Sequence, residues 1–112
     1  NQSDRRLKKY ITASKEKALP ILNAIPMRQY TYKVGAPGAL PGKKVRFGQV
    51  AQELAEVYPE AVVHDEDNDA WYIDKIAIID LLLKGVQELN EKVTSLETEV
   101  RTWKENANGS NH

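Results

Sequence analysis

Apolar residues recur through the last third of the chain in alternating steps of three and four residues. Steps that average 3.5 residues keep one stripe of an α-helix facing a partner helix along its whole length. The pattern therefore predicts a coiled coil whose apolar positions are the a and d sites of a heptad. This predicted seam consists of Ile79, Leu82, Val86, Leu89, Val93, Leu96, Val100 and Trp103.

The residues beside the seam favour a parallel arrangement. Lys92 is expected to face Glu97 of a neighbouring helix, and Glu99 to face Lys104, so both pairs are opposite in sign, although exposed pairs contribute only about 0–1 kcal/mol each. β-Branched residues at the a positions, combined with leucine at the d positions, slightly favour a dimer. These residues leave dimer and trimer both open, and the alternative is one amphipathic helix that packs on its own domain.

Short apolar runs separated by glycine, proline and acidic clusters precede the seam. They predict an α+β fold, in which short helices and mostly antiparallel strands (residues 1–74) precede a long coiled-coil helix with a polar tail (residues 75–112). The first expected elements are a helical turn that buries Leu7, Tyr10 and Ile11, and a helix over 15–23 capped by Ser14. Strands over 29–34 and 44–47 are expected around a loop at 35–42, followed by a helix over 49–57. A hairpin with strands over 61–64 and 71–73 then leads to a long helix that begins near Asp74 and frays over 106–112.

Formal charge is zero over 112 residues, but the charges are segregated along the chain. Residues 1–17 carry six bases and two acids, residues 26–48 carry five bases and no acid, and residues 53–74 carry eight acids and no base. So many acids beside the basic residues at the start of the chain argue against nucleic-acid binding. We expect the two charged regions to complement each other, within one subunit or between subunits.

Two further function classes are disfavoured by composition. The chain has no cysteine, which excludes thiol chemistry and disulfides and fits a reducing compartment. It has no apolar run long enough for a membrane span, so no membrane partner is expected. The abrupt start and end indicate a segment of something larger.

One acidic cluster has the spacing of a metal loop. Asp65, Asp67 and Asp69 follow His64 and match the first ligands of a calcium loop. The glycine and the late glutamate that complete such a loop are absent. We therefore interpret the cluster as a solvated hairpin turn and expect neither a metal nor any other cofactor.

The first residues carry the other candidate chemistry, Ser3 and Lys8. A serine hydroxyl becomes a nucleophile when a base takes its proton, and a lysine amine serves as that base when its surroundings favour the neutral form. Five residues apart at the start of a helical turn, the two side chains can meet. On these residues alone, the more ordinary interpretation is that Ser3 caps a helix beside solvated lysines.

Several blocks, in order along the chain, resemble the C-terminal intramolecular chaperone domains of bacteriophage tailspikes, tail fibres and neck appendages. This is the endosialidase-type, or S74 peptidase, family, which also occurs in a membrane-tethered transcription factor. The matching blocks are Ser3-Asp4-Arg5-Arg6-Leu7-Lys8-Lys9-Tyr10-Ile11, Tyr30-Thr31-Tyr32-Lys33, Gly48-Gln49-Val50-Ala51-Gln52-Glu53-Leu54, Tyr58-Pro59-Glu60-Ala61-Val62, Tyr72-Ile73-Asp74 and the run from Leu81 to Leu89.

The resemblance implies a homotrimeric chaperone that guides an upstream β-rich fibre of the same polypeptide into register and then releases itself. By motif, Ser3 is the expected nucleophile, Lys8 the general base and Gln2–Ser3 the scissile bond, with a structural or site-supporting role for Gln52 and Glu53. The implied setting is the host cytoplasm during virion assembly, followed by release from the mature fibre. The alternatives are a trimerisation module without catalysis and the self-processing domain of a membrane-tethered transcription factor.

Overall fold

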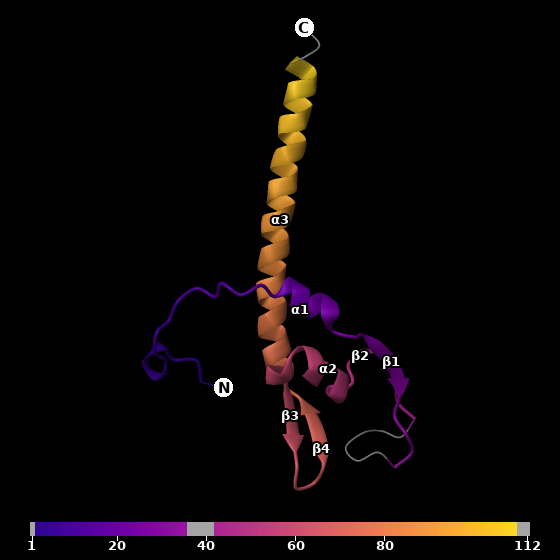
Figure 1. The fold of residues 1–112 in the computed structure, drawn as a ribbon. Coiled ribbons are helices and arrows are strands. Elements are labelled where there is room, and N and C mark those ends of the chain that lie inside the picture. Colours follow the sequence, from indigo (N-terminus) through magenta and orange to yellow (C-terminus); the bar gives the residue numbers. More distant parts are fainter. Residues whose placement is uncertain (1, 36–41, 110–112) are drawn as a thin grey trace.

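A single long helix, α3 (Lys75–Gly109), forms the axis of the protein, and every other element lies at its N-terminal half (Figure 1). The computed structural model describes residues 2–35 and 42–109 and measures 74 × 42 × 21 Å. Short helices and two antiparallel strand pairs precede α3. The predicted mixed fold with antiparallel strands and a long C-terminal helix is thus confirmed. Within the described residues, no helix combines the length and the apolar character required to cross a membrane.

The chain begins with an extended arm, residues 2–17, in which every residue is exposed. The arm contains one short 3₁₀ helix, η1 (Arg5–Leu7). The helical turn predicted to carry Leu7, Tyr10 and Ile11 is wrong, because η1 ends at Leu7. The predicted burial is wrong as well, since Leu7, Tyr10 and Ile11 are 63%, 92% and 50% exposed. These side chains stay exposed because the arm extends away from the body of its own subunit, residues 28–35 and 42–73 (Figure 1).

Helix α1 (Leu19–Ala24) is shorter than the sequence predicted. It begins at Leu19 rather than Lys15, and Ser14 does not cap it, because the N-cap position falls on Ala18. Pro20 consequently lies in the first turn, where its missing N–H costs no helical hydrogen bond. The helix begins where a carboxylate of α3 binds its free N–H groups.

Strands β1 (Arg28–Thr31) and β2 (Lys44–Gly48) form the first antiparallel pair. The strand predicted to run to Val34 ends at Thr31, and residues 36–41 of the predicted loop lie outside the described residues. Gly48 is buried, and a Cβ at this position would lie 2.8 Å from the Tyr30 ring. Glycine therefore permits the close approach of β2 to this tyrosine.

The next elements are α2 (Ala51–Val57), the 3₁₀ helix η2 (Pro59–Ala61) and the hairpin of β3 (Val62–Asp65) and β4 (Ala70–Ile73). The predicted hairpin is confirmed, with strand ends that differ by one residue from the prediction: Val62 pairs with Ile73, and the turn covers 66–69. Asp74 then caps α3, since its carboxylate accepts hydrogen bonds from two N–H groups of the first turn at 3.0 and 3.2 Å. Helix α3 continues to Gly109, so the fraying expected from residue 106 is absent up to that point.

The core of the subunit is small. Among the described residues, its buried apolar side chains are Ala18, Leu54, Ala61 and Leu81. They lie where α2 packs on η2, where η2 packs on α3, and where α1 packs on α3. Beyond α1, no other described helix or strand lies beside α3 (Figure 1).

Candidate functional site

The arm brings Ser3 and Lys8 together. Lys8 Nζ lies 2.6 Å from Ser3 Oγ, within hydrogen-bond distance. This is the contact that a serine nucleophile and a lysine base require for proton transfer. The geometry is compatible with the predicted dyad, and the catalytic roles themselves stay predictions.

Helix η1 produces this approach by reversing the chain between the two residues. Its N-cap is Asp4, not Ser3, because the Asp4 carboxylate accepts a hydrogen bond of 2.8 Å from the N–H of Arg6. The same carboxylate binds the Arg6 guanidinium at 2.8 Å, and the hydrogen bonds from Arg6 lower the pKa of Asp4. The hydrogen bonds and ion pair between Asp4 and Arg6 thus stabilise the short turn that brings Lys8 close to Ser3.

The bond between Gln2 and Ser3 is accessible, since both residues are exposed. A shallow hollow lies against it, and its described lining belongs entirely to the arm: Gln2, Ser3, Asp4, Arg6 and Leu7. Acyl transfer requires fixed hydrogen-bond donors for the oxyanion and exclusion of bulk water. The body of the same subunit supplies neither here, because it does not line this hollow.

The seam residues all lie on an exposed stripe of α3. Their exposed fractions range from 50% for Val93 to 69% for Trp103. A different face of the helix packs against α1 and the body, where the buried residues are Leu81, Gly85 and Glu88. The alternative in which the seam packs on its own domain is therefore wrong for the described chain.

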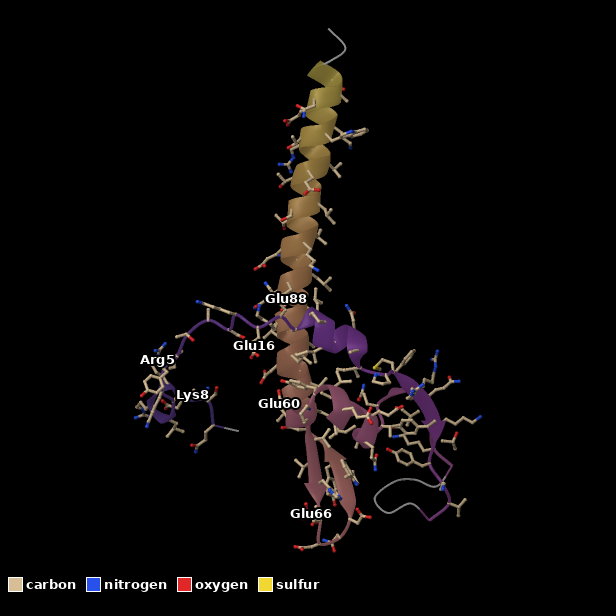
Figure 2. All side chains as sticks on the ribbon, viewed as in Figure 1. Arg5, Lys8, Glu16, Glu60, Glu66 and Glu88 are labelled. Atoms are coloured by element: carbon tan, nitrogen blue, oxygen red, sulfur yellow. The ribbon has the colours of Figure 1, made fainter. Side chains whose placement is uncertain are left out.

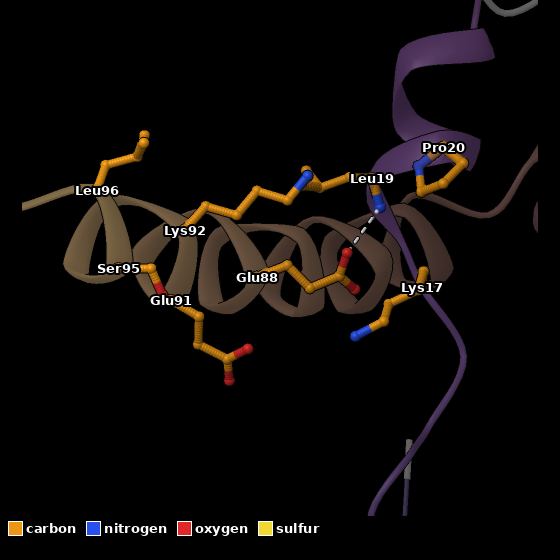
Figure 3. Close-up of a pocket in the computed structure, with 8 residues that line it drawn as sticks. All are labelled: Lys17, Leu19, Pro20, Glu88, Glu91, Lys92, Ser95 and Leu96. Carbon is orange, nitrogen blue, oxygen red and sulfur yellow. Dashed lines mark hydrogen bonds between the residues drawn. The ribbon is translucent and has the colours of Figure 1, made fainter. Parts of the chain in front are cut away.

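Glu88 is a buried carboxylate that the sequence did not single out. It is 5% exposed and binds the N–H groups of Ala18 and Leu19 at 2.6 and 3.1 Å. Figure 3 shows it pointing from α3 at the start of α1. These backbone donors, Ala18 first, lower the pKa of Glu88, and Lys84 at 3.5 Å acts in the same direction.

Glu88 takes the capping role expected of Ser14. Its carboxylate satisfies N–H groups that the first turn of α1 leaves free and complements the helix dipole. The sequence holds only a weak signal for this role, because Leu81, Gly85 and Glu88 are spaced by four and three residues and so share a second face of α3. The groove beside Glu88 (Figure 3) is lined by Lys17, Leu19, Pro20, Glu88, Glu91, Lys92, Ser95 and Leu96.

Gln52 and Glu53 lie on α2, in the body rather than on the arm. Glu53 forms a two-point ion pair with the Arg28 guanidinium, at 3.0 and 2.7 Å, which ties α2 to β1. This pair joins the acidic and basic regions within one subunit. Gln52 lines an aromatic hollow beside Tyr30 and Tyr72. Neither residue meets Ser3 inside one chain.

The acidic hairpin forms a hydrogen-bonded turn. Asp65 accepts hydrogen bonds from the N–H of Asp67 at 3.1 Å and the side-chain amide of Asn68 at 2.9 Å, and these bonds lower its pKa. His64 binds Asp69 at 3.0 Å and stacks on Trp71. Over residues 2–35 and 42–109, no three His, Cys, Asp or Glu side chains gather in a metal-binding cluster.

Comparison with known protein families identifies the family of this chain. The model of the peptidase S74 family, described as chaperone of endosialidase, matches residues 3–63. The match covers more than half of the chain and contains the arm, both strands of the first pair, and α2. It confirms the resemblance that the sequence motifs indicated. No curated protein matches the chain.

Proposed function

Because the chain belongs to the peptidase S74 family, the chaperones of endosialidase, we propose that it is an intramolecular chaperone that trimerises and then cuts itself free. A chaperone-type role follows from the family. The trimer, the cut and the upstream partner are our proposal. The observation that carries it is the 2.6 Å hydrogen bond from Lys8 Nζ to Ser3 Oγ, because it lies within the family match and next to an exposed peptide bond.

The exposed surface of the subunit supports association. The radius of gyration is 21.2 Å, against roughly 13 Å for a compact chain of this length. The accessible surface is 9715 Å², against about 6,200 Å² for a compact monomer of this mass. The excess of roughly 3,500 Å² is in the range of obligate interfaces. A parallel trimer around the seam covers much of it, with Lys92–Glu97 and Glu99–Lys104 as the predicted pairs between helices.

The proposed cut is an acyl transfer followed by hydrolysis. The neutral amine of Lys8 takes the hydroxyl proton of Ser3 as Oγ attacks the carbonyl carbon of Gln2. The C–N bond breaks, and Lys8 returns the proton to the nitrogen of Ser3, which leaves an ester between the Gln2 acyl group and Oγ. Water hydrolyses the ester, so the upstream chain ends in a carboxylate at Gln2 and the chaperone begins with Ser3.

The partner in this proposal is an upstream β-rich fibre, tailspike or appendage of the same polypeptide. Non-local β pairing folds slowly, because distant segments must meet before they stabilise each other. Three helices joined at the seam raise the local concentration of the three upstream chain ends. The cut then releases the chaperone after assembly in the host cytoplasm.

Intact mass of the chain with its upstream segment tests the cut. We expect a fragment that begins at Ser3, and we expect Ser3→Ala and Lys8→Ala to abolish it. Ser14→Ala is the matched control on the same exposed arm and should leave the fragment unchanged. An uncut wild-type chain that still trimerises would instead identify a trimerisation module without catalysis.

A further inference from the structure

The arm is apolar as well as basic, yet no described residue buries its larger apolar side chains. Leu7, Tyr10 and Ile11 are at least half exposed, and a solvated segment gains nothing from three such residues close together. Tyr10 also has a left-handed backbone, with φ of 51°. This conformation is uncommon for a bulky residue and persists where surrounding contacts hold it. Both features indicate that the arm packs against another protein surface.

Two basic residues of the arm also lack charged partners among the described residues. Arg5 and Lys9 form no ion pair or hydrogen bond through their side chains with any described residue. Between α2 and the hairpin turn, four carboxylates are likewise free of hydrogen bonds and ion pairs within the described residues. We call them the acidic block: Glu56, Glu60, Glu66 and Asp67. Figure 2 shows Arg5 and Lys8 on the arm, well apart from Glu60 and Glu66 on the body.

We infer that the arm of one subunit docks on the acidic block of a second copy of this chain. The bases of the arm would face the carboxylates, and its apolar residues would cover exposed side chains of the hairpin, Val63 (56% exposed) and Tyr72 (57%). Opposite charges across such a surface fix register and partner choice more than they add affinity.

The geometry at the base of the arm favours a second copy over the arm's own body. Glu88 holds the N–H groups of Ala18 and Leu19, so the chain enters α1 in a set direction. At its base the arm lies beside its own body, since Ser14, Glu16 and Lys17 line a hollow together with Glu60. The arm then runs away from that body, so Arg5 and Lys8 lie well apart from Glu60 and Glu66 of their own chain (Figure 2). Parallel α3 helices around the seam would bring the body of a neighbour alongside.

The inference rests on the proposed function at one point, because the arm carries Ser3 and Lys8. Within one chain, the described lining of the hollow at Gln2–Ser3 comes from the arm alone. A neighbouring subunit would supply the missing wall and exclude water, which makes the cut conditional on assembly.

Cysteine cross-linking tests the docking, since the chain has no cysteine of its own. We expect Lys9→Cys combined with Glu60→Cys, or with Glu66→Cys, to give covalent dimers and trimers on a non-reducing gel. The matched control pairs Lys9→Cys with Thr98→Cys, on exposed α3 far from the acidic block, and each single variant is a second control. A disulfide within one chain, or no disulfide in a chain that sedimentation shows to be oligomeric, would overturn the inference.

Charge reversal gives a second, independent test. Lys9→Glu and Glu60→Lys should each slow the appearance of the Ser3 fragment, by about two- to fivefold for an exposed pair, and the double variant should recover. A double variant that cuts more slowly than either single variant, with the two effects combined, would contradict docking at this pair. The cross-link repeated in Ser3→Ala does not depend on cutting, so a failed cut and a failed docking are distinguishable.

Discussion

Truncation of one seam leucine tests whether α3 associates through its exposed stripe. Leu89 lies at a d position and is 50% exposed in the subunit. Full burial of a leucine side chain stabilises by about 1.5–3 kcal/mol, so covering the remaining half contributes about 1 kcal/mol per chain. Leu89→Ala removes most of this contribution. Three copies in a trimer therefore lose about 3 kcal/mol, which corresponds to roughly a hundredfold fall in the association constant.

Sedimentation equilibrium over a range of concentrations measures this loss and the number of subunits together. Glu91→Ala, two residues along the same helix but off the seam, is the matched control and should leave association unchanged. Both substitutions exchange good helix formers for alanine, so helix propensity does not separate them. Equal association of the two variants would refute a seam at these positions. A loss near 2 kcal/mol with two subunits would instead favour a dimer.

Three further predictions concern stability. Leu54 is fully buried, so Leu54→Ala should lower the free energy of unfolding by about 2–5 kcal/mol in a urea titration. A side chain at Gly85 would overlap Leu22 of α1, so Gly85→Leu should separate the two helices and destabilise by about 1–3 kcal/mol, seen as faster proteolysis at α1; unchanged proteolysis would contradict this packing. The pKa of Glu88 is lowered in the folded state from an ordinary value of 4.5. Its ionised carboxylate therefore stabilises the folded state above that pH, and this stabilisation is lost as the pH falls below it. In Glu88→Gln, the free energy of unfolding should fall less steeply as the pH is lowered below 4.5. The exposed control Glu91→Gln should show the same fall as the wild-type chain.

Local patterns of the sequence were sufficient for several elements. The 3.5-residue period of α3, the acidic turn of the hairpin and the cap at Asp74 each depend on residues close together in the chain. The ordered motifs around Ser3 and Gln52 were specific enough to identify the family. For the candidate site, the spacing of Ser3 and Lys8 anticipated a contact that one short turn produces.

Tertiary structure decided what depends on distant residues. Helix α1 begins at Leu19 because Glu88, about seventy residues later in the chain, binds its first N–H groups, and no local pattern around Ser14 contains that partner. The three apolar residues of the arm looked like a buried turn, yet the body of their own subunit does not cover them. Periodicity identifies which residues can share an apolar face, but only the packed structure shows whether a surface inside the chain receives that face. Within residues 2–35 and 42–109, no surface covers the seam or the apolar residues of the arm, because the subunit buries its core against other faces.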